Sequence, residues 1–410
     1  MASWGAFLII RFHHPAGDCR PPLEERLRSP LDLLDGILPG ETATSFLLAC
    51  LAPPPVAVEA WQRWRSRHDP VEGLAGTNAG LRGLAALLAT SLFNAGAPLH
   101  RSDAAWLRAA LLHEQRRSDR YRDILTEILS TLTATGLPFL LARGAAVAET
   151  ILPEPWLRHC HDIDLLVPHE HLDSAAAALA GAGLREQPIP GPSRSFVHRR
   201  LLPVRLHPLT LKPPFEGPAI RLFEGRAISI QALGIAVRRP ADDDLLLHLC
   251  AHAACSQGRS TLRWVGDAHA IVVTRPDLDW QRLRETAAAS GLAAPLAATL
   301  SYLAKRIGTP VPPATLAALS ADAARASWLE RDLLIHAARL GRPSWLTDLW
   351  RSAGVRSRLT LARWILFPDS TYLARLDSGP RRTVPHLRAR HWRRGWQSLP
   401  GVIGRRMAGS

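Results

Sequence analysis

Lysine is almost absent from this chain. Nearly all of its 50 Lys and Arg residues are arginine, because Lys212 and Lys305 are the only lysines, and the formal net charge is +14. A strongly positive charge is typical of proteins that bind polyanions. The arginines are dispersed, however, apart from one concentration near the C-terminus. A nucleic acid is therefore a possible partner but not the favoured one.

Cysteine and long apolar runs are scarce as well. The five cysteines are odd in number and include no CxxC pair, a usage typical of a reducing compartment. No apolar run approaches the roughly 20 residues that a membrane span requires. The FLII run near the N-terminus reads as a strand rather than a signal peptide. We therefore expect a cytoplasmic protein without a membrane partner.

Two familiar catalytic signatures are missing. The sequence has no GxSxG elbow, which argues against a Ser/His/Asp hydrolase, and no Walker A motif, which argues against a P-loop NTPase. The remaining patterns predict an α+β fold, in which a core of about 120 residues alternates short apolar strands with helices between mainly helical flanks. The regions that we expect are an N-terminal appendage (1–40), a helical N-terminal region (41–115), the core (116–240), a helical C-terminal region (241–380) and a basic Trp/Arg-rich tail (381–410).

Two aspartates mark the start of a predicted buried strand, in RHCHDIDLLVPHE (158–170). Because alternate residues of a strand share a face, Asp162 and Asp164 project the same way while Ile163 points into the core. Two carboxylates on one face repel each other unless a cation lies between them. Paired Mg²⁺ ions that bridge nucleotide phosphates are held by such carboxylates. A solvated strand end is the alternative explanation of this pair.

A glycine turn precedes the aspartates, in LPFLLARGAAVAE (137–149). Here a short apolar strand ends at Gly144 and a helix follows directly. A turn of this kind leaves backbone N–H groups and a helix N-terminus facing an incoming anion, as in a triphosphate site. A simple tight turn is the alternative.

From residue 42 to 395 the sequence resembles a bacterial family of uncharacterised nucleotidyltransferases within the DNA polymerase β superfamily. The resemblance rests on LLARG, an arginine before DIDLLV, VRLHPLTL, and the histidine-bearing helix DDDLLLHLCAHAAC. It implies a small palm domain that moves a nucleoside monophosphate from an NTP to a hydroxyl or phosphate. The acceptor that we expect first is a peptide or small molecule, and tRNA second.

The resemblance also implies roles for single residues. Asp162 and Asp164 would be catalytic and would ligate two Mg²⁺ ions. Arg143, in place of the usual lysine, and Gly144 would approach the nucleotide phosphates. Arg158 would either clamp a phosphate or brace the strand.

The sequence departs from the family where a third carboxylate is expected, shortly before a Leu-His pair. Arg205 stands at this position, two residues before His207. An arginine beside two metal ions is electrostatically unfavourable unless a phosphate accompanies them. Three explanations are open. The enzyme uses two aspartates plus His207, or it has lost turnover and kept nucleotide binding as a silent scaffold, or the strand register differs. Arg205 and His207 are in every case candidates to contact the nucleotide.

A histidine helix and the C-terminal tail complete the candidates. On the predicted helix, His248 and His252 share a face with Asp244 and Cys255, a spacing that also occurs in zinc sites. The favoured interpretation is structural: His248 and His252, with Asp267 as a partner, support the site from behind. The tail, with Trp392 and Trp396 among arginines, is either a loosely packed end or a contact for an anionic surface, a nucleic acid or an acidic peptide.

Overall fold

The computed structural model describes residues 38–70, 79–187, 193–208, 220–255 and 262–325, together with six single residues between 383 and 392. The expected N-terminal appendage lies almost entirely outside the described residues. So do residues 326–380 of the C-terminal helical region and most of the basic tail.

The N-terminal region is helical, as predicted, and packs around tryptophan. It contains α3 (Glu41–Leu51), α4 (Pro54–Arg65), α5 (Ala79–Arg82) and α6 (Ala85–Asn94). Pro54 occupies the first turn of α4, where a missing N–H costs nothing. The Trp64 ring stacks on Trp61 and meets Phe46 edge-on. These buried aromatic contacts hold α3 against α4.

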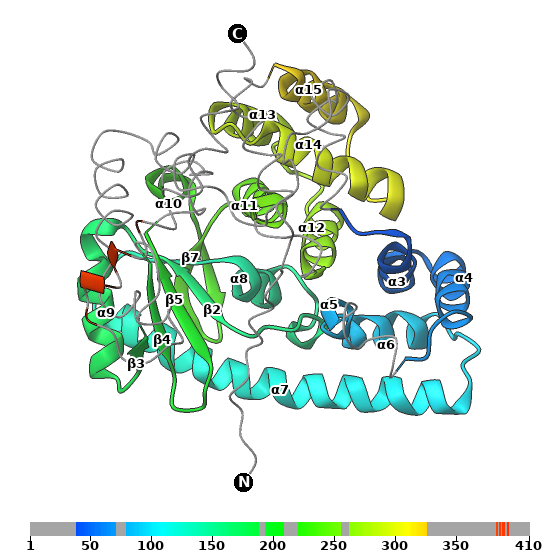
Figure 1. The fold of residues 1–410 in the computed structure, drawn as a ribbon, viewed down its shortest axis with the longest axis horizontal. Coiled ribbons are helices and arrows are strands. Elements are labelled where there is room, and N and C mark those ends of the chain that lie inside the picture. The colour runs from blue at the N-terminus through cyan, green and yellow to red at the C-terminus, as the bar shows by residue number, and fades with distance from the viewer. Residues whose placement is uncertain are drawn as a thin grey trace.

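The helix α7 (Arg101–Ala134) is 34 residues long and joins the two halves of the molecule. It runs along the base of the structure, from beneath α4 to beneath the sheet (Figure 1). Its buried residues recur at intervals of three and four, so that one stripe faces the core along its C-terminal half. The boundary expected near residue 115 therefore falls within one helix rather than between two.

A mixed five-stranded sheet forms the centre of the core region. Its strands are β1 (Leu140–Leu141), β2 (Ile163–Leu166), β3 (Arg185–Gln187), β4 (Arg194–Val197) and β5 (Pro203–His207), in the order β1-β2-β5-β4-β3. Only β2 and β5 run parallel; the other neighbours are antiparallel. Two helices, α8 (Arg143–Thr150) and α9 (Leu172–Gly181), pack on the sheet. The predicted α+β class is confirmed, and β4 and β5 form an antiparallel hairpin within it.

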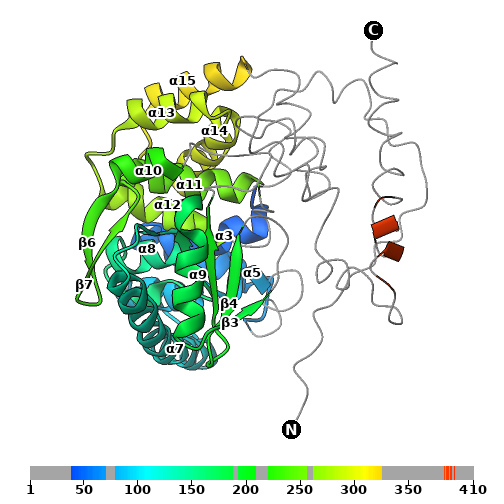
Figure 2. The ribbon, with the colours of Figure 1, turned by 90° about the vertical axis from the view of Figure 1, so that its left-hand side faces the viewer.

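A separate hairpin and further helices complete the described chain. The hairpin β6 (Ile228–Ala232) and β7 (Ile235–Arg239) follows α10 (Ile220–Arg226) and lies near β1, on the side away from β3 and β4 (Figure 2). The C-terminal helices are α11 (Asp242–Cys255), α12 (Arg263–Thr274), α13 (Trp280–Ala289), α14 (Ala293–Tyr302) and α15 (Pro313–Ala324). No helix among the described residues is long and apolar enough to cross a membrane.

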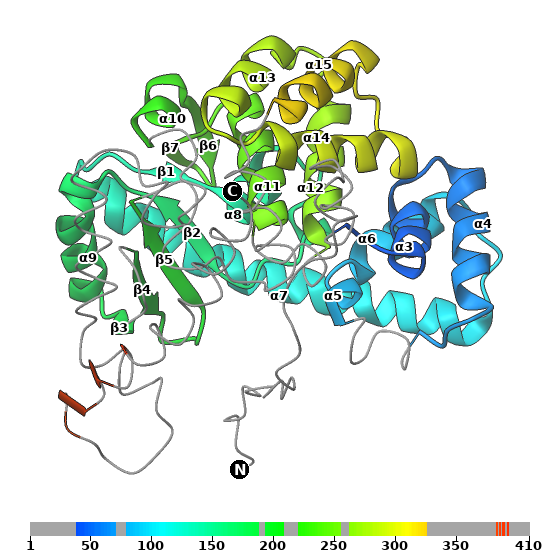
Figure 3. The ribbon, with the colours of Figure 1, turned by 45° about the horizontal axis from the view of Figure 1, so that its top comes forward.

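The helical regions and the sheet share one hydrophobic core. A single cluster of buried residues extends from α3 through α7 and the sheet to α15. The helix α12 contacts both α3 and α8, which places it between the N-terminal helices and the sheet (Figure 3). The helix α12 therefore links the N-terminal helices to α8, which begins beside the two aspartates.

Two leucines of α7 provide a matched test of this core. Leu125 is completely buried, whereas Leu112 is 56% exposed. Leu125→Ala should lower the free energy of unfolding by about 2–5 kcal/mol, because it leaves a cavity. Leu112→Ala should change it by no more than about 0.5 kcal/mol. Urea denaturation measures both, and equal effects would show that this stripe of α7 does not face the core.

Candidate active site

Asp162 and Asp164 stand at the start of β2, and their carboxylates face the side chains of β5. Asp164 lies in the strand and Asp162 directly before it, while Ile163 between them is completely buried. In the parallel pairing, Asp164 is level with Arg205, and Leu166 is level with His207. Strand alternation therefore places these charged and polar side chains on one face of the sheet.

Asp164 is held by two partners at once. Arg143 Nη1 donates to Asp164 Oδ2 at 3.2 Å, and His207 Nε2 lies 2.8 Å from Asp164 Oδ1. Because a carboxylate only accepts, the hydrogen of the imidazole sits on Nε2, which leaves Nδ1 as an acceptor. His207 Nδ1 faces the hydroxyl of Ser193 at 3.0 Å. Burial lowers the pKa of His207 despite its bond to Asp164, so the ring is neutral near pH 7.

Asp162 is paired with the arginine that replaces the third acid. Arg205 Nη1 donates to Asp162 Oδ2 at 2.9 Å, and the Arg205 side chain is 39% exposed. The Tyr121 hydroxyl donates to the Asp162 backbone carbonyl and fixes the start of the strand. The register therefore does bring Arg205 beside the aspartates, which closes the third of the three explanations.

The two carboxylates differ in their protonation. Burial raises the pKa of Asp162 to about 6, and the neighbouring charge of Asp164 adds to this. Burial acts in the same direction on Asp164, but Arg143 and the hydrogen bond from His207 hold its pKa well below the usual range. Asp164 is thus ionised at every physiological pH, whereas Asp162 is the carboxyl that gains a proton as the pH falls toward 6.

The two carboxylates are ligands of the kind that a hard divalent cation prefers, but each is already paired with an arginine. Asp162 and Asp164 carry two negative charges, and Arg143 and Arg205 balance them. In the part of the chain that the structure describes, no group of three or more His, Cys, Asp or Glu side chains could hold a metal ion. Two carboxylates fit one Mg²⁺ ion whose other ligands are water and phosphate oxygens. Such an ion requires the guanidinium groups to move away first.

Arg143 occupies a strained position at the start of α8. Its φ of 50° lies in the left-handed region, which non-glycine residues seldom adopt, whereas the φ of Gly144 does not. Its guanidinium bridges Asp164 and the buried His248, because Nε donates to His248 Nε2 at 3.4 Å. The structure thus places His248 in contact with Arg143. The ring of His252 lies one step further away, 6.5 Å from that of His248.

Gly144 and Arg158 form a buried brace. Arg158 donates from Nε and Nη2 to the Asp267 carboxylate at 2.9–3.0 Å, and both side chains are nearly buried. A Cβ atom at Gly144 would lie 2.0 Å from Arg158 Nη1. The glycine therefore leaves room for a guanidinium. In this structure the Arg158 guanidinium pairs with Asp267 of α12.

Nothing among the described residues supports the zinc alternative, because no group of three or more His, Cys, Asp or Glu side chains there could hold a metal ion. Asp244 is engaged with Arg226, which donates to both of its carboxylate oxygens. Asp267, the other residue expected behind the site, binds Arg158. Sequence reasoning missed Ser193 and Tyr121 entirely, since a lone serine before a strand and a tyrosine in a long helix carry no recognisable pattern.

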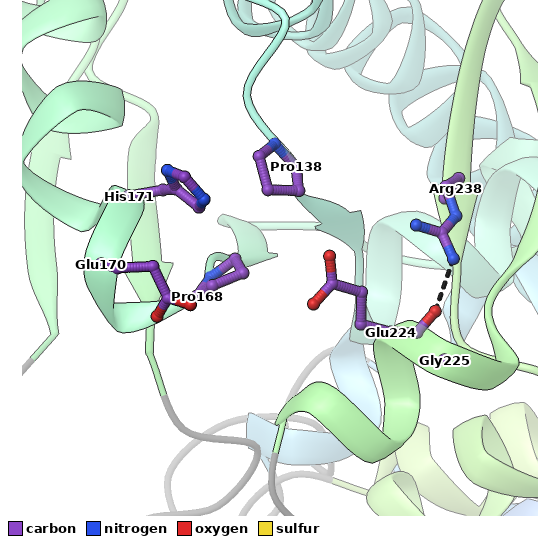
Figure 4. A pocket seen from close by; sticks show the side chains of 7 residues that line it. All are labelled: Pro138, Pro168, Glu170, His171, Glu224, Gly225 and Arg238. Carbon is purple, nitrogen blue, oxygen red and sulfur yellow. Dashed lines mark hydrogen bonds between the residues drawn. The ribbon is translucent and has the colours of Figure 1, made fainter.

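A concavity of about 420 Å³ lies away from the aspartates. Pro138, which precedes β1, and Pro168, which follows β2, line it together with Glu224 of α10 (Figure 4). Since Leu140 of β1 pairs with Leu166 of β2, these prolines mark the opposite end of β2 from Asp162. This concavity is therefore not part of the aspartate site.

Comparison with known proteins agrees with the geometry of the core. The sequence model of a family described as uncharacterised nucleotidyltransferase matches residues 79–308, which is more than half of the chain. The match spans α5 to the end of the helical segment after α14, and includes every residue of the aspartate site. No curated protein matches the chain.

Substituting Gly144 tests the brace. Gly144→Ala should push the Arg158 guanidinium away and break its pair with Asp267, which lowers the free energy of unfolding by about 3 kcal/mol. Gly181→Ala in α9 is the control, because no heavy atom lies within 4 Å of the added Cβ. It should change stability by less than about 1 kcal/mol. Equal stability of the two variants in urea denaturation would contradict the brace.

Proposed function

Because this chain belongs to the uncharacterised nucleotidyltransferase family, we propose that it transfers a nucleoside monophosphate from an NTP to a hydroxyl or phosphate acceptor and releases pyrophosphate. The observation that carries the proposal is the set of side chains that β2 and β5 present on one face of the sheet. On it, two carboxylates lie beside two arginines and a neutral imidazole.

The arginines are the proposed phosphate ligands. A triphosphate brings several negative charges and matches the planar fork of a guanidinium better than one carboxylate does. Arg205 is suited to change partners, since its side chain is 39% exposed and held by a single aspartate. Arg143 is nearly buried at the start of α8, where the helix N-terminus also favours an anion. The arriving triphosphate therefore draws both guanidinium groups off the carboxylates.

The released carboxylates are the proposed ligands of Mg²⁺. Asp162 and Asp164 would hold it, and the ion would neutralise charge that develops on the transferring phosphoryl group. The family resemblance also predicts a second ion, but no third carboxylate is available to bind it within the described ranges. Its remaining ligands would have to come from the nucleotide and water.

His207 is the proposed acceptor of the proton that the attacking hydroxyl loses. His207 would thus serve as the general base that a third carboxylate is expected to provide. Asp164 fixes the hydrogen of the ring on Nε2, so that the lone pair of Nδ1 can accept the proton. A peptide or small molecule remains the acceptor that we propose first. The helices α11 and α12, which contact α8 behind the site, are best placed to change the positions of the site's side chains.

A nucleotide-binding protein without turnover is the second candidate. One observation favours it: Arg205 stands beside Asp162 at the position where an acid is expected, and neutralises that carboxylate. In such a protein the arginines would bind the triphosphate without a cation between the aspartates. Calorimetry distinguishes the two candidates, because NTP binding that is the same with and without Mg²⁺ supports the second.

Removing the carboxylates tests the catalytic proposal. The protein is incubated with labelled ATP, CTP, GTP or UTP, Mg²⁺ and a panel of peptide and small-molecule acceptors, and released pyrophosphate is measured. The double variant Asp162→Asn with Asp164→Asn should lose at least about 100-fold in rate. Asp173→Asn is the control, since this carboxylate on α9 is 93% exposed. Transfer that survives the double substitution would refute the assignment.

A further inference from the structure

Ser193, His207 and Asp164 form a continuous hydrogen-bonded chain across two strands. Ser193 directly precedes β4, and the antiparallel pairing of Arg194 with Leu206 sets it beside His207. The Ser193 hydroxyl lies 3.0 Å from His207 Nδ1, and His207 Nε2 lies 2.8 Å from Asp164 Oδ1. Only one imidazole ring therefore separates the serine hydroxyl from the carboxylate.

The directions of these hydrogen bonds are fixed by the carboxylate. Asp164 can only accept, so His207 Nε2 donates to it and Nδ1 must accept from the Ser193 hydroxyl. A carboxylate, an imidazole and a serine in this order are the components that make a serine nucleophilic, because the acid holds the ring in the tautomer that takes the serine proton. Here the serine faces Nδ1 instead of Nε2. As in an activated serine of that kind, the proton of the hydroxyl passes to the imidazole, and the carboxylate holds the ring.

The position that an outside acceptor would need is already taken. If His207 receives the proton of the attacking hydroxyl, that hydroxyl must lie at Nδ1, and Ser193 is there. Ser193 is part-buried rather than sealed off, and Arg205 on the same sheet face supplies positive charge for a phosphate nearby. We propose that Ser193 is itself a nucleotidyl acceptor, so that the protein forms a nucleotidyl-serine. This inference rests on the proposed function.

The step balances with an NTP as the other reactant. Ser193 Oγ bonds to the α-phosphorus, and the bond from this phosphorus to the oxygen that bridges to the β-phosphate breaks. Pyrophosphate leaves with that oxygen, and the hydroxyl proton passes to His207 Nδ1. The product is a phosphodiester between Ser193 and a nucleoside.

The test combines mass spectrometry with pyrophosphate release. The full chain is incubated with each NTP and Mg²⁺, and peptides are mapped for one added nucleoside monophosphate. The adduct should appear on Ser193 and vanish in Ser193→Ala. His207→Gln keeps a donor for Asp164 but loses the ring acceptor, and should slow the adduct about 100-fold. Ser195→Ala is the matched control, because Ser195 lies in β4 two residues after Ser193 and level with Arg205; it should leave the adduct unchanged.

A second arm uses diisopropyl fluorophosphate without metal or nucleotide. Its phosphorus accepts Ser193 Oγ while fluoride leaves, so labelling reports an activated hydroxyl by itself. Labelling of Ser193 that His207→Gln suppresses supports the inference, and an unlabelled Ser193 overturns it. Pyrophosphate release to outside acceptors without an adduct on Ser193 also overturns it, but leaves the proposed function intact. If no pyrophosphate forms under any condition, both the proposed function and the nucleotidyl-serine step fail. Labelling of Ser193 by diisopropyl fluorophosphate would then show only that its hydroxyl is activated.

Discussion

The pairing of two aspartates with two arginines at the start of β2 is the constraint on which the rest of the site depends. Asp162 and Asp164 are too close and too buried to carry two uncompensated charges, and Arg143 and Arg205 compensate them. The resting site is therefore electrically neutral. Under the proposed function, a divalent cation would gain little by approaching it until the triphosphate draws the guanidinium groups away.

The surrounding structure holds Arg143 where this exchange is possible. Its strained backbone begins α8, and its guanidinium bridges Asp164 and His248 of α11. Behind it, the Arg158 pair with Asp267 ties the same turn to α12. Because α12 also contacts α3, this brace connects the N-terminal helices to the site. The helical flanks thus support the site electrostatically as well as by packing.

Local sequence patterns predicted the centre of the site but not its supports. Asp162 and Asp164 were recognisable because strand alternation alone puts them on one face, and the neighbouring hairpin brought Arg205 to the same place. The turn pattern at Gly144 predicts a phosphate contact but not the Arg158 guanidinium that lies against this glycine. The partner of Arg158 is 109 residues away along the chain, and no local spacing indicates such a pair.

The most direct test of the neutral resting site is the affinity for Mn²⁺ or Mg²⁺ without nucleotide in Arg205→Asp. This change supplies the missing acid and removes the cation that neutralises Asp162, so divalent affinity should rise at least about tenfold. Arg63→Asp, an equal change of charge at an exposed position of α4, is the control and should leave the affinity unchanged. Calorimetric titration gives both values. Equal affinity in the unmodified protein and Arg205→Asp would contradict the account, because Arg205 would then not be what keeps the cation out.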